Sequence, residues 1–185
     1  MHIIGGQKKG HSLFGPGPKD IRPIQHLVRK ALFDMIRQLV EGARFLDLFA
    51  GTGSVGLEAL SRGTRNCTFV DRSQQAISLI SKNLEKLDYT DRAVVEKNDV
   101  GSALEKYDRR ARRFDIAFVG PPYETNLATT TLEQLNSLKV IRPGGVIIVE
   151  VFHKDDLPGE LSNLNQIDSR EYGQTKLAFY RLTRD

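Results

Sequence analysis

The stretch RFLDLFAGTGSVGLEALSRG, residues 44–63, contains the pattern that decides the fold. Residues 44–49 form a mostly apolar run of strand length, interrupted by Asp47. Residues 54–62 have apolar side chains at helical spacing and stop at Gly63. A glycine-rich turn joins the two segments. This order of strand, turn and helix is typical of the first unit of an α/β domain that binds a nucleotide.

The turn carries three glycines, Gly51, Gly53 and Gly56, in a G-x-G-x-x-G pattern, and Asp71 lies 20 residues beyond the first of them. Asp71 also ends the next predicted strand, residues 66–71. Glycines there allow a ligand to approach the backbone closely, and an acid at this distance accepts hydrogen bonds from ribose hydroxyls. A turn that binds nothing is the simpler alternative. The strand context and the spaced acid favour a ligand with a ribose.

Outward from this unit, expected strands and helices alternate along the chain. Two of the strands, residues 114–120 and 146–151, are apolar on both faces. Such strands indicate an α/β fold with a mostly parallel sheet and helices on both faces. Further strands are expected at 93–99 and, antiparallel and after a turn, within 170–182. Helices are expected at 23–39, 77–87, 100–109 and 126–138, and a turn at 142–145.

The leading segment differs from the body of the chain in composition and charge. Residues 1–20 are rich in Gly and Pro and predict an arm or small hairpin before one domain at 21–185. Residues 1–30 carry six Lys or Arg and one Asp, a net charge of +5, so the remainder sums to −1 within the total of +4. A basic arm favours a nucleic-acid partner, although a solvated tail fits the charge equally well. With neither a signal-like segment nor an apolar run long enough to cross a bilayer, the sequence predicts a cytoplasmic protein.

Acidic residues at the ends of successive strands narrow the choice of ligand. Asp47 precedes the glycine turn on the strand itself, where a carboxylate would repel the pyrophosphate of NAD but attract a cationic sulfonium with an α-amino group. Asp99 follows the third strand, where it could accept a hydrogen bond from the amine of an adenine ring. Asp47, Asp71 and Asp99 would meet at the carboxyl edge of the sheet, where open α/β sheets bind ligands. Adenine, ribose and an amino-acid cation together describe S-adenosylmethionine.

With these residues in place, the chain resembles the class I S-adenosylmethionine-dependent methyltransferases, and more narrowly the RsmD type of bacterial small-subunit (16S) ribosomal RNA guanine-N2 methyltransferases. The resemblance runs from HIIGG through FLDLFAGTGSVGLEALSRG, VDRS and VGPPYE to YGQTKLAFYRL. It implies a Rossmann-like, seven-stranded sheet with an antiparallel last strand, and ribosomal RNA or an assembling small subunit as the partner. The chain is expected to be a monomer. The cofactor contacts that it implies are Asp47, Phe49, Ala50, Gly51, Thr52, Gly53, Ser54, Asp71, Arg72, Asn98, Asp99 and Val100.

The catalytic loop implied by the resemblance is Gly120, Pro121, Pro122 and Tyr123, and its first residue departs from the usual Asp or Asn. An exocyclic purine amine is a poor nucleophile, because its lone pair is delocalised. A side-chain oxygen and the carbonyl of the first proline can bind the amine hydrogens and free that lone pair. Tyr123 could stack on a base removed from its helix, or be a half-buried loop aromatic. Gly120 offers backbone groups only, which predicts weak methylation unless a water supplies the missing oxygen.

The expected RNA contacts lie in the arm and at the start of the first helix. Arg22, Pro23, Val28 and Arg29 match the pattern with which this helix begins in the family. The Thr-Thr-Asp that usually follows Pro23 is replaced by Ile24, Gln25 and His26. The basic cluster at 109–113 would lie at the opposite edge of the sheet and is interpreted as solvated surface. No Cys/His spacing indicates a metal site. The alternatives left open are a catalytically silent cofactor- and RNA-binding assembly factor, a DNA adenine-N6 methyltransferase and an NAD-binding oxidoreductase. The predicted RNA contacts are Lys8, Lys9, Arg22, Pro23, His26 and Arg29.

Overall fold

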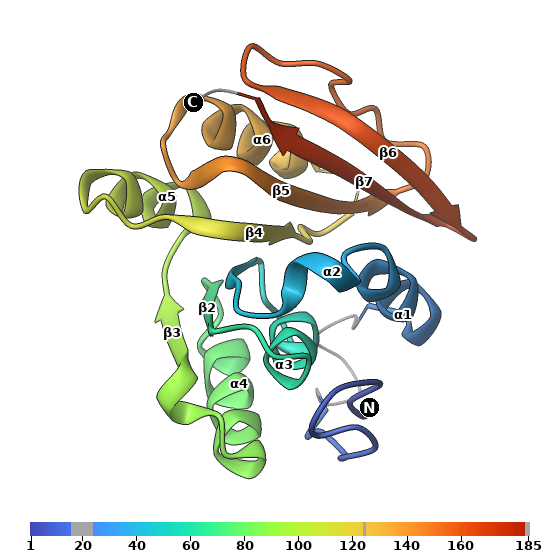
Figure 1. Ribbon diagram of the computed structural model, residues 1–185, viewed down its shortest axis with the longest axis vertical. Coiled ribbons are helices and arrows are strands. Elements are labelled where there is room, and N and C mark those ends of the chain that lie inside the picture. Colours follow the sequence, from blue (N-terminus) through green and yellow to red (C-terminus); the bar gives the residue numbers. More distant parts are fainter. Residues whose placement is uncertain (16–23, 124, 184–185) are drawn as a thin grey trace.

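The chain folds around one mixed sheet in the computed structural model, which describes residues 1–15, 24–123 and 125–183 (Figure 1). The described part contains seven strands in the order β3-β2-β1-β4-β5-β7-β6. The strands are β1 (Arg44–Leu48), β2 (Asn66–Asp71), β3 (Ala93–Lys97), β4 (Phe114–Val119), β5 (Ile141–Phe152), β6 (Leu164–Tyr172) and β7 (Thr175–Leu182).

Strands β1 to β5 pair in parallel, whereas β7 pairs antiparallel with both β5 and β6. This arrangement confirms the predicted seven-stranded sheet with an antiparallel last strand. Because β1 to β5 run in one direction, their carboxyl ends meet at a single edge of the sheet, with β1 at its centre between β2 and β4.

Helices cover both faces of the sheet, as predicted, and each face has its own apolar core. The first core is built on Phe45, Phe69 and Phe118 of the sheet, and the second on Leu46, Ala117 and Ile147. The first face carries α1 (His26–Met35), α2 (Arg37–Val40), α3 (Ser54–Ser61) and α4 (Gln74–Leu87), and the second carries α5 (Val100–Arg109) and α6 (Leu127–Ser137); a short 3₁₀ turn (Thr90–Arg92) precedes β3.

Two expected elements differ from the structure, and one observed strand was largely unexpected. The helix expected at 23–39 is broken at Ile36, where α1 ends and α2 begins. The turn expected at 142–145 is part of β5, because the pairing with β4 shifts register there and lets exposed residues bulge out of the strand. Most of β6 has no counterpart among the predicted elements, because its polar edge residues lack an apolar alternation. No helix in the described ranges is long and apolar enough to cross a membrane.

Candidate active site

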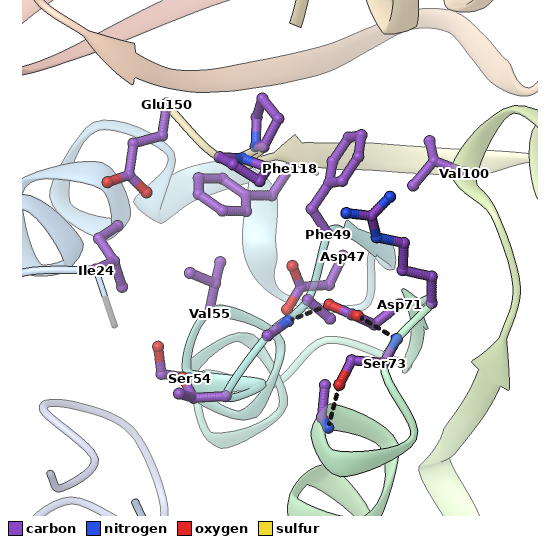
Figure 2. Close-up of a pocket in the computed structure, with 18 of the residues that line it drawn as sticks. Ile24, Asp47, Phe49, Ser54, Val55, Asp71, Ser73, Val100, Phe118 and Glu150 are labelled. Carbon is purple, nitrogen blue, oxygen red and sulfur yellow. Dashed lines mark hydrogen bonds between the residues drawn. The ribbon is translucent and has the colours of Figure 1, made fainter. Parts of the chain in front are cut away.

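A cavity of about 540 Å³ opens at the carboxyl edge of the sheet, between the glycine turn after β1 and the loop after β4 (Figure 2). Its volume falls in the range typical of small-molecule sites, ~300–1,000 Å³. All four residues of the predicted catalytic loop line it. So do all the predicted cofactor residues except Gly53: Asp47, Phe49, Ala50, Gly51, Thr52, Ser54, Asp71, Arg72, Asn98, Asp99 and Val100.

The glycine turn bends sharply away from β1 to leave this space. Phe49, Gly51 and Gly53 all have positive φ, at 58°, 52° and 72°. The third glycine of the pattern, Gly56, has a packing role instead, because a Cβ there would lie 2.2 Å from Cε1 of Phe69 on β2. Gly56 therefore allows α3 to lie close against the sheet, while Gly51 borders the ligand space.

Asp71, at the end of β2, ties the glycine turn to the start of α4. Its Oδ2 accepts a hydrogen bond from the backbone N–H of Gly51 at 2.8 Å, and its Oδ1 accepts one from Ser73 N–H at 2.8 Å. An ionised carboxylate has about four acceptor sites, so these two bonds orient the group and leave capacity for ribose hydroxyls. The carboxylate is held at the cavity wall in a defined orientation.

Asp47 is the most buried acid of the cavity wall, with 1% of its surface exposed. Its Oδ2 accepts a hydrogen bond from Gly56 N–H at 2.9 Å. Burial raises the pKa of Asp47 well above its ordinary value, the bond from Gly56 opposes this shift, and the charges of Asp71 and Glu150 add to it. A cationic ligand group beside Asp47 would favour its ionised form.

Asp99 caps the helix that follows β3. Its Oδ1 accepts a hydrogen bond from Ser102 N–H at 3.3 Å, and Val100 begins α5 beside it. The preceding residue, Asn98, donates its backbone N–H to the carbonyl of Asp71 at 3.0 Å. These bonds join the ends of β2 and β3, so that Asp71 and Asp99 border one cavity, as the strand-end argument predicts.

The loop after β4 is anchored to β5 and β7 through Tyr123. Its hydroxyl donates to Oε1 of Glu150 at 3.1 Å and lies 2.8 Å from Oγ1 of Thr175. The half-buried ring borders the cavity and lies 6.1 Å from the ring of Phe152. The hydroxyl of Tyr123 is thus held by hydrogen bonds, and the predicted stacking on a base would use the face of its ring.

Several cavity residues were missed by the sequence analysis. The most informative is Glu150, an acid at the end of the doubly buried strand β5, which the strand-end argument used for Asp71 could have found. Ile24 and Gln25 border the cavity just before α1, consistent with the expected position of this helix start near the catalytic edge. The missed lining residues are Ile24, Gln25, Val55, Ser73, Gln75, Ala76, Phe118, Leu127 and Glu150.

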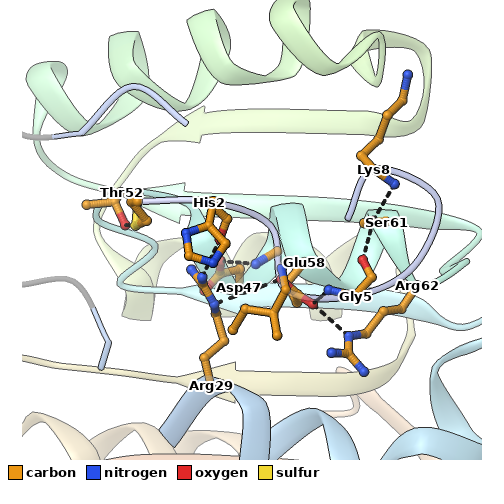
Figure 3. Close-up of polar contacts among 12 residues, drawn as sticks. His2, Gly5, Lys8, Arg29, Asp47, Thr52, Glu58, Ser61 and Arg62 are labelled. Carbon is orange, nitrogen blue, oxygen red and sulfur yellow. Dashed lines mark hydrogen bonds and ion pairs between the residues drawn. The ribbon is translucent and has the colours of Figure 1, made fainter. Parts of the chain in front are cut away.

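The first residues of the chain form a hairpin that packs along α3 (Figure 3). Glu58 of α3, fully buried, accepts hydrogen bonds from the N–H groups of Ile4 and Gly5 and from Nε of Arg62, each at 2.8 Å. Arg29 of α1 lies on the other side of this carboxylate, with its Nε 3.9 Å from Oε2. The acid therefore joins the hairpin, α1 and α3.

The position of Arg29 contradicts its predicted RNA contact. Its side chain is 2% exposed, and its Nη2 donates to the carbonyl of His2 at 2.6 Å. Burial lowers the pKa of Arg29, and the charge of Glu58 opposes that shift. A guanidinium enclosed by the hairpin cannot reach a phosphate, so Arg29 stabilises the arm instead.

The other predicted RNA contacts do not gather at one place. Lys8 lies at the tip of the hairpin, where its N–H donates to Oγ of Ser61, the last residue of α3, and exposed Lys9 follows it. The cavity borders the opposite end of α3, about 10 Å away at the rise of ~1.5 Å per residue. Exposed His26 instead follows the cavity residue Gln25, with its ring 5.4 Å from that of His2. Arg22 and Pro23 lie outside the described residues.

The basic cluster before β4 is engaged in intramolecular contacts. Arg109 pairs with Glu105 at 3.9 Å, Arg113 lies 3.8 Å from Asp108, and Arg112 donates to Oγ1 of Thr68 at 2.6 Å. Within residues 1–15, 24–123 and 125–183, no group of three His, Cys, Asp or Glu side chains could bind a metal ion.

Comparisons with known proteins agree with this architecture over nearly the whole chain. YlbH of Bacillus subtilis, provisionally named an rRNA methyltransferase, is 36% identical over 181 residues, which cover 98% of each chain. Ribosomal RNA small subunit methyltransferase D of Escherichia coli (strain K12) is 30% identical over 98% of this chain and 89% of the relative. The solved structure of Escherichia coli yhhF has a TM-score of 0.84 at 29% identity, with 100% of this chain and 99% of that chain covered.

A more distant structure supports the fold alone. An RNA methyltransferase from Salinibacter ruber, solved in complex with S-adenosyl-L-homocysteine, has a TM-score of 0.69 at 11% identity, and the match covers 89% of this chain and 95% of that chain.

The family model described as Conserved hypothetical protein 95 matches residues 1–181. The chain therefore belongs to this family, whose relatives include ribosomal RNA small subunit methyltransferase D.

Proposed function

We propose that this chain transfers a methyl group from S-adenosylmethionine to the exocyclic N2 amine of a guanine in small-subunit (16S) ribosomal RNA. The observation that carries the proposal is a single cavity bordered by Asp47, Asp71 and Asp99 on one side and by the loop Gly120–Tyr123 on the other. The family and its relatives support methyl transfer to ribosomal RNA. Such an RNA is found in the cytoplasm, where we propose that the protein acts as a monomer.

The side chains of the cavity fit S-adenosylmethionine better than a dinucleotide. Buried Asp47 would bind the α-amino group, because a carboxylate that has lost its water gains most from a cationic partner. Asp71 would accept the ribose hydroxyls, while Asp99 would accept the adenine amine beside the apolar Val100. A pyrophosphate at the glycine turn would instead meet the negative charge of Asp47.

The cofactor supplies a methyl group on a sulfonium, which is already activated for transfer. The protein then has to position the amine and make its lone pair available. The Pro121 carbonyl would accept one amine hydrogen, and the ring of Tyr123 would stack on the guanine after this base leaves its helix.

The direct test is transfer of labelled methyl groups to 16S RNA from cells that lack this gene, both as naked RNA and as assembling small subunits. We expect one methyl group on one guanine, located by mass spectrometry. Calorimetry should find binding of S-adenosylmethionine and none of NAD. Binding of NAD alone would support an oxidoreductase and contradict the proposal.

A catalytically silent cofactor- and RNA-binding factor is the second candidate, because Gly120 has no side-chain oxygen. Loss of one oriented polar group from such a site typically costs ~10²–10³ in rate. The two candidates differ in one result. A silent factor would bind S-adenosylmethionine and RNA with no methyl transfer to either form of the substrate.

A further inference from the structure

The pairing of β4 with β5 brings Glu150 next to Gly120. Val119 pairs with Val149 in the parallel register, so Gly120 and Glu150 are the next residues on two neighbouring strands. The N–H of Gly120 donates to the carbonyl of Leu48 at 3.3 Å, which continues the ladder one residue beyond β4. Neighbouring strands lie about 4.8 Å apart, so side chains at these two positions would be in contact distance.

Both positions face the same side of the sheet. Residues two apart on a strand share a face, so Gly120 has the orientation of Phe118, the register partner of Asp47. A Cβ on Gly120 would lie 2.8 Å from Cε1 of Phe118. Glu150 shares this face and lines the cavity, and Figure 2 shows its carboxylate on the cavity side of the strand.

Two hydroxyl groups hold this region of the cavity in place. Oε1 of Glu150 accepts the hydrogen bond from Tyr123, and the same phenol contacts Oγ1 of Thr175, a residue only 1% exposed. A carboxylate has about four acceptor sites on its two oxygens, so a bond from Tyr123 is compatible with further bonds. The charge of Glu150 also contributes to the raised pKa of Asp47, which is consistent with its closeness to the cofactor pocket.

We propose that the carboxylate of Glu150 binds the N2 amine of the target guanine and supplies the side-chain oxygen that Gly120 lacks. The inference rests on the proposed function and names the acceptor for the same site. Glutamate is one methylene longer than aspartate, which suits a group that starts from the neighbouring strand and reaches across to the loop. The side-chain oxygen would thus come from the end of β5 instead of the end of β4.

The proposed step needs no further reactant. The amine lone pair forms the new nitrogen–carbon bond, while the sulfur–methyl bond breaks and leaves its electron pair on sulfur. The amine then carries an extra positive charge and loses the proton that it shares with Glu150, which passes it to water. A carboxylate suits this role because hydrogen bonds to an ionised acceptor are about twice as strong as neutral ones.

The test is a set of variants at positions 150 and 120, assayed for kcat on undermethylated small subunits and for cofactor affinity by calorimetry. We expect Glu150→Met to lower kcat about 10²–10³-fold and Glu150→Gln to fall between it and the wild type. Cofactor affinity should change less than about tenfold in both. Gly120→Asn, combined with Glu150→Met, should restore at least about tenfold in kcat, whereas Gly120→Ala, which adds only the Cβ, should restore nothing.

Two controls separate binding of the amine from support of the loop. Tyr123→Phe and Thr175→Val remove hydrogen bonds of the loop and leave the carboxylate. If either slows turnover as much as Glu150→Met, and Gly120→Asn rescues nothing, Glu150 acts only by positioning Tyr123 and the inference is wrong. It is also wrong if Glu150→Met keeps kcat within about threefold of an active wild type. A wild type that binds cofactor but methylates neither form of the RNA overturns the proposed function and, with it, this inference.

Discussion

The buried carboxylate of Glu58 allows a quantitative prediction about how the hairpin is held. In the Glu58→Ala variant, the N–H groups of Ile4 and Gly5 and the Nε of Arg62 lose an acceptor at 2.8 Å each. Arg29, which is 2% exposed, loses the anion 3.9 Å from its Nε. The change therefore leaves a buried cation and two backbone donors without their partner.

Removal of one partner of a buried ion pair typically costs about 3–5 kcal/mol, because the remaining charge stays in a medium of low dielectric. For a chain of 150–250 residues, each 1 kcal/mol corresponds to roughly 2–4 °C in Tm. We therefore expect Glu58→Ala to lower Tm by roughly 6–20 °C. Urea denaturation should find the corresponding loss in the free energy of unfolding.

Two control variants test whether burial is the cause. Asp34→Ala breaks an i,i+4 ion pair with Lys30 that is 2.6 Å long, but both of its side chains are more than half exposed. This variant should cost less than about 1 kcal/mol. Arg29→Met should cost less than Glu58→Ala, although the carbonyl of His2 loses its bond from Nη2, because no buried charge is left without a partner. Glu58 would keep Arg62 and both backbone donors. A Glu58→Ala protein that melts within about 3 °C of the wild type would refute the argument.

Four further predictions concern the cavity and the arm. Asp47→Asn should raise Tm at neutral pH and weaken S-adenosylmethionine binding more than about tenfold. Because folding raises the pKa of Asp47, the wild type loses stability as the pH rises above the pKa of this group in the unfolded chain. The difference in Tm between the variant and the wild type should therefore widen from acid to neutral pH. Asp71→Ala should weaken calorimetric affinity for the cofactor by at least about tenfold, through lost ribose contacts and a freed glycine turn. Gly56→Ala should cost about 1–3 kcal/mol in urea denaturation, since its Cβ would overlap a Phe ring. Neutralising both Lys8 and Lys9 with Gln should lower the salt slope of RNA binding by up to about two, because each lysine that contacts a phosphate contributes about one; an unchanged slope would contradict the RNA contact of the hairpin tip.

Much of the fold could be predicted because buried parallel strands carry a local signal. The strands at 66–71 and 114–119 are mostly apolar and each bury four consecutive residues, since both faces of the sheet are covered. The same reasoning failed for β6, a polar strand at the edge of the sheet beside β7. Its residues resemble a loop in sequence, because their hydrogen bonds, not their apolar side chains, define the strand.

The candidate site divides in a similar way. The side chains of Asp47, Asp71 and Asp99 could be placed together because parallel strands end at one edge, a rule that needs only their order in the sequence. Arg29 could not be assigned correctly by such a rule. Its charge and its position in a family motif predict an RNA contact, but whether a guanidinium faces solvent or a buried acid depends on which segment covers it.

By itself, the amino-acid sequence determined the α/β class, the glycine turn and three of the acids that border the cavity, Asp47, Asp71 and Asp99, because each depends on short-range spacing or on strand order. Only the tertiary structure decided that the hairpin encloses Arg29 and Glu58, and that Glu150 stands beside Gly120 at the end of the neighbouring strand. Arg29 and Glu58 are 29 positions apart in the chain, and Gly120 and Glu150 are 30 positions apart. The first contact depends on the packing of a separate hairpin, and the second depends on the register of the sheet. No local pattern of residues carries that information, because it arises only when distant segments are packed against one another.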